Sequence, residues 1–235
     1  MSALKAELRR SANPSKARLL SGFFKTGPGE YGEGDVFLGL TVPQSRALAN
    51  RYLPLGHKTA AALLKSPVHE ERLIALLLLV QLYAGGSPSE RNKIYDCYMR
   101  SARFINNWDL VDLSAPKIPG VHLLGRSRKP LFRFAKSKNL WERRIAAVSC
   151  LHFIRQRDFA DFLSIARLLL RDEHDLIHKA VGWMLREAGK RDLRVLLSFL
   201  KAHAAVMPRT MLRYSIEKLP QSQRRVFMNA REVAV

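Results

Sequence analysis

Cysteine is nearly absent from this sequence of 235 residues, which contains only Cys97 and Cys150. Each stands alone on an apolar stretch, with no Cys-x-x-Cys motif nearby. This usage argues against a zinc ribbon, a dithiol redox motif and a secreted disulfide framework. It also indicates a reducing compartment, because disulfide-dense domains belong to oxidising ones.

Long hydrophobic runs are missing as well. The longest, residues 73–80, is about ten residues too short to span a membrane and is followed by Gln81, so a buried helix is expected there. The first ten residues carry a charge every few positions and lack the apolar core of a signal peptide. We therefore expect neither export nor contact with a membrane.

Acidic residues are scarce, since 20 Asp and Glu stand against 40 Lys and Arg and leave a formal net charge of +20. With 47% hydrophobic residues, the composition is otherwise that of an ordinary globular chain. This combination excludes a disordered basic tail protein. The surplus positive charge is spread along the whole chain and must decorate a folded surface, for which a polyanion is the natural partner.

Signals for β-strands are almost absent, because the sequence has no Asn-Gly or Asp-Gly hairpin turn and little strict alternation of apolar and polar residues. Apolar residues instead recur at helical spacing, as at Val148, Leu151 and Ile154. Proline and glycine interrupt these patterns, for example at residues 27–43 and 85–88. The sequence therefore predicts an all-α protein.

Small or compact apolar residues recur at a nearly constant interval along the chain. The four matching positions are Ala75, Val111, Ala146 and Gly182, at steps of 36, 35 and 36 residues. Such a period predicts stacked helix pairs, each burying its apolar face against its neighbours. The period is slightly shorter than that of HEAT repeats, so the predicted fold is a HEAT-like α-solenoid. Chance similarity among amphipathic helices is the alternative.

Residues at equivalent repeat positions face the same side of a solenoid, so functional groups there would line one surface. One step after the small residue stand Leu76, Asp112, Ala147 and Trp183. Three steps before it stand Arg72, Trp108, Arg143 and Lys179. Aromatic rings, a carboxylate and basic side chains therefore gather on one family of helices.

Three short motifs have plainer explanations than chemistry. Residues 27–32 match Gly-x-Gly-x-x-Gly, but no strand precedes them and glutamates would repel a pyrophosphate, so a loop is expected. His174 and His178 lie four residues apart without a third ligand at useful spacing, which favours a solvated or phosphate-facing pair over a metal site. Ser114-Ala-Pro-Lys117 is interpreted as a helix end. We expect no metal and no cofactor.

The segment 106–112, Asn-Asn-Trp-Asp-Leu-Val-Asp, is harder to explain by structure alone. Asn107 suits a helix N-cap and Asp109 a first helical turn. Asp112 lies beyond that turn, one turn after Trp108 on the same face and beside apolar residues. Its structural alternative is a hydrogen bond to a neighbouring helix end.

Two further tryptophans are each followed by an arginine three residues on. Trp141 precedes Arg144 and Trp183 precedes Arg186. A surface salt bridge is the structural alternative for Arg144, and a core position is the alternative for Trp183.

Four segments together resemble the AlkD-type DNA alkylation-repair glycosylases, in the same order and over nearly the whole chain. They are Phe37-Leu-Gly-Leu-Thr-Val-Pro43, Asn107-Trp-Asp-Leu-Val-Asp112, Asn139-Leu-Trp-Glu-Arg-Arg-Ile-Ala-Ala147 and Ile177-His-Lys-Ala-Val-Gly-Trp-Met-Leu-Arg-Glu187. The resemblance implies a single domain over residues 1–235, a HEAT-like superhelix whose concave basic face grips duplex DNA. It implies excision of cationic purines alkylated at N3 or N7, such as 3-methyladenine and 7-methylguanine, without flipping the base into a pocket.

The resemblance also assigns roles to individual residues. Asp112 matches the catalytic carboxylate, and Trp108 and Trp183 match the aromatic residues that face the sugar. Phe23 is expected where the family often has a tyrosine, so that a hydroxyl contact is lost and an aromatic surface remains. Arg144 matches the arginine that holds the DNA backbone. Beyond the resemblance, further DNA contacts are expected from Arg143, Lys179 and Arg186, with Phe23 beside them.

An alkylated purine leaves as a neutral base, so no strong general acid is required, whereas the sugar becomes cationic and needs a carboxylate and π faces. No lysine stands in an evident nucleophilic setting, which predicts a monofunctional enzyme that leaves an abasic site.

The expected partner is double-stranded DNA with alkylated bases, bound by a cytoplasmic, nucleoid-associated monomer. A catalytically silent HEAT-like protein that binds duplex or branched DNA, or scaffolds other proteins, is the main alternative. A metal-dependent hydrolase using His174 and His178 is a third.

Overall fold

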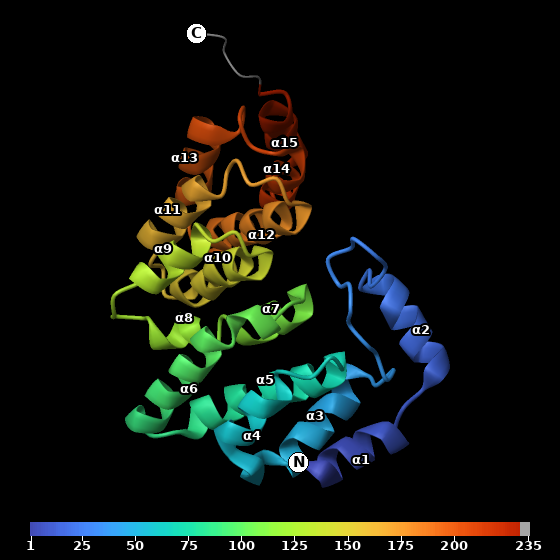
Figure 1. Ribbon diagram of the computed structural model, residues 1–235. Helices are drawn as coiled ribbons and strands as arrows, with labels where there is room; N and C mark the ends of the chain where they lie inside the picture. Colours follow the sequence, from blue (N-terminus) through green and yellow to red (C-terminus); the bar gives the residue numbers. More distant parts are fainter. Residues whose placement is uncertain (231–235) are drawn as a thin grey trace. The chain divides into compact units, whose positions relative to one another are not determined.

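The structure, a computed structural model, describes residues 1–230 and is all-α, as the sequence predicts (Figure 1). No β-strand forms among these residues, and an isolated bridge joins Val36 to Val68. The chain divides into two compact units, Met1–Ser114 and Ala115–Val235, which we call the N-terminal unit and the C-terminal unit. The single domain stays a prediction.

The N-terminal unit is built around one buried helix, α5 (His69–Gly85), which packs against α3, α4, α6 and α7. Every residue from 69 to 79 is buried, which confirms the buried helix expected over residues 73–80. A helix that is apolar on all sides is stable only when neighbours cover it. The other elements are α1 (Ser2–Arg10), α2 (Pro14–Phe23), α3 (Val42–Arg51), η1 (Leu53–Leu55), α4 (Gly56–Leu63), α6 (Pro88–Arg100), η2 (Ala102–Phe104) and α7 (Trp108–Ser114).

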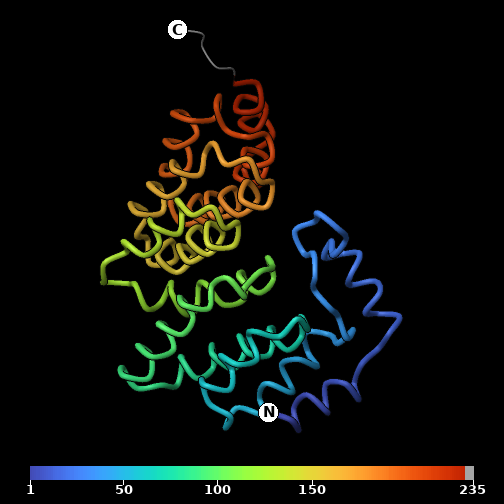
Figure 2. The backbone as a smooth tube through the Cα atoms, viewed as in Figure 1, coloured from blue at the N-terminus to red at the C-terminus, as the bar shows by residue number. Residues whose placement is uncertain are grey.

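A long loop, residues 24–41, connects α2 to α3 (Figure 2). Its second half is held by the buried carboxylate of Glu70, which accepts hydrogen bonds from the N–H groups of Leu38, Gly39 and Leu40 at 2.8–3.2 Å. At Gly39, φ is +87° and a Cβ atom would lie 2.2 Å from the carbonyl oxygen of Asn13. Only glycine fits such a position, which gives the Phe-Leu-Gly motif a structural reason.

Residues 27–32, in the first half of this loop, form turns, as the sequence predicts. They are not preceded by a strand, unlike the glycine-rich turns that bind phosphate. The N–H of Gly27 donates to Glu30, and the N–H of Gly29 donates to Glu33, both at 2.9 Å. These two carboxylates occupy the amide groups that a phosphate would need.

The C-terminal unit has two central helices, α10 (Leu140–Arg155) and α12 (Asp175–Arg191), which pack on each other. Gly182 lets α12 approach α14 closely, because a Cβ atom there would lie 2.5 Å from the carbonyl oxygen of Met211. The surrounding helices are α8 (Pro119–His122), α9 (Lys129–Ala135), α11 (Ala160–Leu168), α13 (Leu193–His203), α14 (Arg209–Ile216) and α15 (Gln221–Met228).

The small residues of the predicted repeat all lie buried on helices. Ala75 is on α5, Val111 on α7, Ala146 on α10 and Gly182 on α12. Two repeat-equivalent arginines also make equivalent contacts. Arg72 donates to the carbonyl oxygen of Ser66 at 2.9 Å, and Arg143 donates to that of Ser137 at 3.0 Å, six residues back in each case. This shared arrangement supports a structural repeat, while the HEAT-like solenoid itself stays a prediction.

Cys97 and Cys150 are both buried and form no disulfide. Burial raises the pKa of each thiol, so neither is a reactive thiolate at neutral pH. Within residues 1–230, none of the helices combines the length and apolar character needed to cross a bilayer.

Candidate functional site

Asp112 and Trp108 lie one helical turn apart on the short helix α7 and are both half-buried. The side-chain oxygen of Asn107 accepts the N–H of Trp108 at 2.9 Å, and Asp109 accepts the N–H of Leu110 at 2.8 Å. These contacts satisfy free amides of the first turn. Residues four apart on a helix share a face, so the Asp112 carboxylate and the Trp108 indole project to the same side of α7.

The indole of Trp108 is held by other aromatic residues of the N-terminal unit. It stacks on Phe24, with ring centroids 5.1 Å apart and planes at 24°. Phe23, with 63% of its surface exposed, meets Trp108 edge-to-face at 5.8 Å. The indole N–H donates to the hydroxyl of Tyr31 at 3.3 Å. The sequence predicts only an aromatic surface from Phe23, whereas the structure adds the hydroxyl of Tyr31, from the loop, beside Trp108.

A buried charge network that no sequence motif indicates lies next to these aromatic residues. The ring of His69 lies between two carboxylates, with Nδ1 3.2 Å from Asp35 and Nε2 2.8 Å from Asp109. An ionised carboxylate can only accept hydrogen bonds, so both ring nitrogens donate and the ring is an imidazolium. Arg72 adds a second cation, with Nη2 2.6 Å from Asp35.

The pKa values of this network agree with that charge state. Burial lowers the pKa of His69, but hydrogen bonds to Asp109 and Asp35 outweigh burial and raise it to about 9. Burial raises the pKa of Asp35, but the hydrogen bond from His69 and the charge of Arg72 bring it below the usual value. His69 and Asp35 therefore form an ion pair at neutral pH.

The C-terminal unit carries the remaining predicted site residues on α10 and α12. Trp183 is half-buried on α12. Arg144, on α10, is only 5% exposed, and its Nη1 donates to the carbonyl oxygen of Leu176 at 2.5 Å. Arg144 is therefore mostly buried, and one of its five N–H groups is already bound to a backbone carbonyl.

Each of the other predicted DNA-binding cations of this unit has an acidic partner. Arg143 binds Asp172 at 2.6 Å and Lys179 binds Asp175 at 2.7 Å. Arg186 pairs with Glu217, which follows α14. The side chain of Lys179 is 40% exposed, against 18% for Arg143 and for Arg186, so Lys179 is the most accessible of the three.

His174 and His178 contact different groups and do not face a common site. Nδ1 of His174 accepts the N–H of Leu176 at 3.1 Å and so caps α12. His178 contacts the carbonyl oxygen of Asp172 through Nε2. No set of three or more His, Cys, Asp or Glu side chains is arranged to hold a metal ion in the part of the chain that is described.

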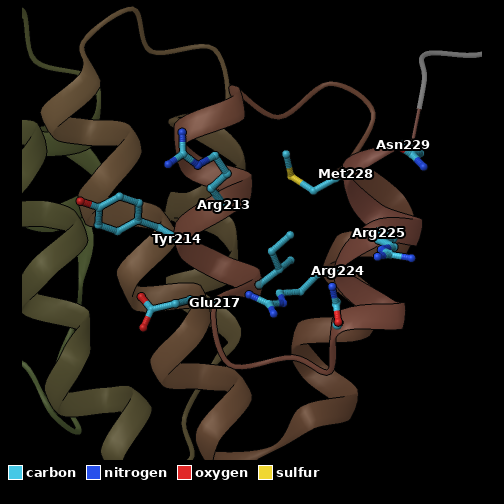
Figure 3. Close-up of a pocket in the computed structure, with 9 residues that line it drawn as sticks. Arg213, Tyr214, Glu217, Arg224, Arg225, Met228 and Asn229 are labelled. Carbon is cyan, nitrogen blue, oxygen red and sulfur yellow. The ribbon is translucent and has the colours of Figure 1, made fainter.

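Positive charge is concentrated in the C-terminal unit. Its sequence holds 25 Lys and Arg against 10 Asp and Glu, a net charge of +15, whereas the N-terminal unit has 15 against 10, a net charge of +5. The same unit has a pocket of about 590 Å³ between α14 and α15, and three arginines help to line it (Figure 3). Arg213 and Tyr214 come from α14, and Arg224 and Arg225 come from α15. None of the predicted site residues lines this pocket.

Comparisons with known proteins give the family and the fold of this chain. A family model described as DNA alkylation repair enzyme matches residues 4–219, which spans both units. A solved structure described as a predicted DNA alkylation repair enzyme from Enterococcus faecalis is similar, with a TM-score of 0.72 and 21% sequence identity. The similarity covers 89% of this chain and 97% of that chain, and it shows a shared fold. A comparison with curated proteins found no match.

Proposed function

Because the chain belongs to the DNA alkylation repair enzyme family, we propose that it is a monofunctional DNA glycosylase acting on cationic N3- and N7-alkylated purines in duplex DNA. The observation that carries the proposal is the carboxylate of Asp112, half-buried on α7 one turn from the Trp108 indole. A protein that only bound the DNA backbone would gain nothing from this acid, because it repels phosphate. A glycosylase needs it opposite a sugar that becomes positively charged.

The chemistry requires stabilisation of the sugar more than protonation of the base. An N3- or N7-alkylated purine already carries a positive charge, so it departs as a neutral molecule while the deoxyribose becomes oxocarbenium-like. A carboxylate about 4 Å from that developing charge contributes on the order of 4 kcal/mol at an effective dielectric constant near 20. This corresponds to roughly a thousandfold in rate.

Asp112 has a second task in the proposed reaction. The carboxylate accepts a hydrogen bond from the attacking water and so orients its oxygen toward the sugar. The π face of Trp108 is proposed to add cation–π stabilisation to the same charge, and the sugar contact of Trp183 stays a prediction. Because neither task reads the edges of the base, we propose that the lesion stays stacked and is selected by its own charge and lability.

The basic C-terminal unit is proposed to bind the DNA backbone. Its net charge of +15 favours a polyanion without regard to base sequence. Lys179, Arg143 and Arg186 hold acids in the structure, so phosphates would compete with these carboxylates. Each phosphate that these cations neutralise releases counterions from the DNA, so binding is expected to depend strongly on salt.

The direct test is to incubate the protein with methylated duplex DNA and to measure free 3-methyladenine and 7-methylguanine by chromatography. We expect free base to be released and the strand to break only after alkali, as for an abasic site. Asp112→Asn should lower the rate at least about a hundredfold. Asp96→Asn is the matched control, since Asp96 is an exposed acid on the neighbouring helix α6 and should leave the rate unchanged.

Two results would contradict the proposal. DNA binding without release of any base would instead identify a catalytically silent HEAT-like repeat protein. Strand cleavage without alkali would contradict the monofunctional mechanism.

A further inference from the structure

His69, the first residue of α5, lies next to the aromatic residues that hold Trp108 and next to the first turn of α7. Its ring nitrogens meet Asp35 from the loop and Asp109 from α7. With 2% of its surface exposed, the ring is almost fully removed from water. A buried charge persists only where it is paired on each side, so this imidazolium is held in a fixed place.

Asp109 links the His69 ring to α7. Its Oδ1 accepts the N–H of Leu110 at 2.8 Å, while its Oδ2 lies 2.8 Å from Nε2 of His69. One carboxylate thus joins the first turn of α7 to the first residue of α5. Because α7 is a single short helix, its orientation fixes the direction of Asp112 one turn further along.

The face of the His69 ring is linked to Trp108 through stacked aromatic rings. The imidazolium stacks on Phe37 at 4.5 Å and 22°, and it lies against Phe24 at 5.1 Å and 34°. Phe24 stacks in turn on the indole of Trp108 at 5.1 Å. The ring that supports Trp108 is therefore held by the ring of His69.

A neutral side chain would not keep this arrangement. A neutral imidazole has one N–H and one lone pair, so only one of the two carboxylates could receive a hydrogen bond. The other carboxylate would face a lone pair at about 3 Å, which is repulsive. The loop or α7 would then have to move.

We propose that His69, held as an imidazolium between Asp35 and Asp109, is a positioning residue that orients Trp108 and Asp112 toward the sugar. This inference rests on the proposed glycosylase function of Asp112. It assigns His69 no contact with DNA, and its effect passes through the direction of α7 and through the face of Phe24.

The test is His69→Gln, with single-turnover release of 7-methylguanine and DNA affinity measured separately. We expect the release rate to fall about tenfold to a hundredfold, because a displacement of about 1 Å in a reacting group has effects of this size. DNA affinity should stay within about twofold, since the basic C-terminal unit is untouched. A fall in affinity that accounts for the whole loss of activity would overturn the proposal.

A double-mutant cycle distinguishes positioning from a general loss of stability. Because His69 acts partly through Asp112, His69→Gln should lower the residual rate of Asp112→Asn by a clearly smaller factor than it lowers the wild-type rate. Fully multiplicative losses would overturn the proposal. Release by His69→Gln at the wild-type rate would overturn it while leaving the glycosylase function intact, and a wild-type protein that releases no purine would overturn both.

A matched control exists in the C-terminal unit. Arg128 is a half-buried cation between Asp158 and Asp161, at 2.5 and 2.9 Å, and it lies 3.8 Å over the ring of Phe153. Arg128→Gln removes a comparable cation between two carboxylates, although these carboxylates are more exposed, without changing a residue that contacts α7 in the N-terminal unit. It should lower stability and leave the release rate unchanged at a temperature well below unfolding. An equal loss of rate in both variants would show that stability alone is responsible and would overturn the proposal.

Fluorescence gives a readout that does not depend on activity. In a protein with Trp141→Phe and Trp183→Phe, Trp108 is the single indole. We expect His69→Gln to change its emission maximum or its quenching by acrylamide, and Arg128→Gln to leave both unchanged. An unaltered Trp108 signal in His69→Gln would overturn the proposal. Should His69→Gln not fold, Asp109→Ala repeats the test, because it removes the carboxylate that joins α7 to His69.

Discussion

Alkaline pH is expected to destabilise the protein through His69, with a size that follows from the structure. The pKa of His69 is about 9 in the folded protein and about 6.5 in an unfolded chain. Between these values the folded state binds more protons, so stability falls as pH rises. The contribution is fully present below about pH 6.5 and lost above about pH 9. At about 1.36 kcal/mol per pKa unit it amounts to about 3 kcal/mol.

The assay is urea unfolding, followed by circular dichroism at about pH 6 and about pH 9.5, of the wild type and His69→Gln. Other groups with raised pKa values, among them Tyr98 and the two cysteines, contribute equally to both proteins. Asp35 does not act in this window, because its lowered pKa contributes stability that is lost only as pH falls through the acid range. The wild type should lose about 3 kcal/mol more than the variant over this interval. An equal loss in both proteins would refute the account of the His69 network.

Three further outcomes are expected. Gly182→Ala should lower the free energy of unfolding by about 1–3 kcal/mol, because the new Cβ atom would meet the Met211 carbonyl, whereas Gly85→Ala, with open space around it, should not destabilise the protein in thermal unfolding. Glu70→Gln should cost about 1–3 kcal/mol in the same assay, since a neutral amide accepts the loop N–H groups more weakly. The logarithm of DNA affinity should fall linearly with the logarithm of salt concentration, by about 0.9 per phosphate contact, and a slope near zero would contradict binding by the basic unit.

The helices were predictable from the sequence because their signals are local. Apolar spacing predicts the buried helix over residues 73–80, and the recurrence of small residues marks positions where helices touch, as Gly182 does against α14. The Phe-Leu-Gly motif can be identified in the sequence, but the sequence does not show why it is needed. Its cause, a buried Glu70 that binds three successive N–H groups, lies more than 29 residues away and leaves no pattern in the loop.

The His69 network could not be predicted either, because its residues lie far apart in the sequence. Its hydrogen bonds join residues 34 and 40 positions apart, which no short motif records. The sequence also gives the charge of an arginine but not its partner. Arg143 was expected on the DNA backbone, and the structure shows it bound to Asp172 and to the carbonyl oxygen of Ser137. Its DNA contact stays a prediction.

The central claim is that the Asp112 carboxylate stabilises a positively charged sugar as the damaged base leaves. The most direct measurement is the single-turnover rate of 7-methylguanine release at saturating protein, compared between the wild type and Asp112→Asn. The account predicts a rate at least about a hundredfold lower for the variant, with DNA affinity equal or slightly higher because a negative charge is gone. A variant that releases the base as fast as the wild type would contradict the claim.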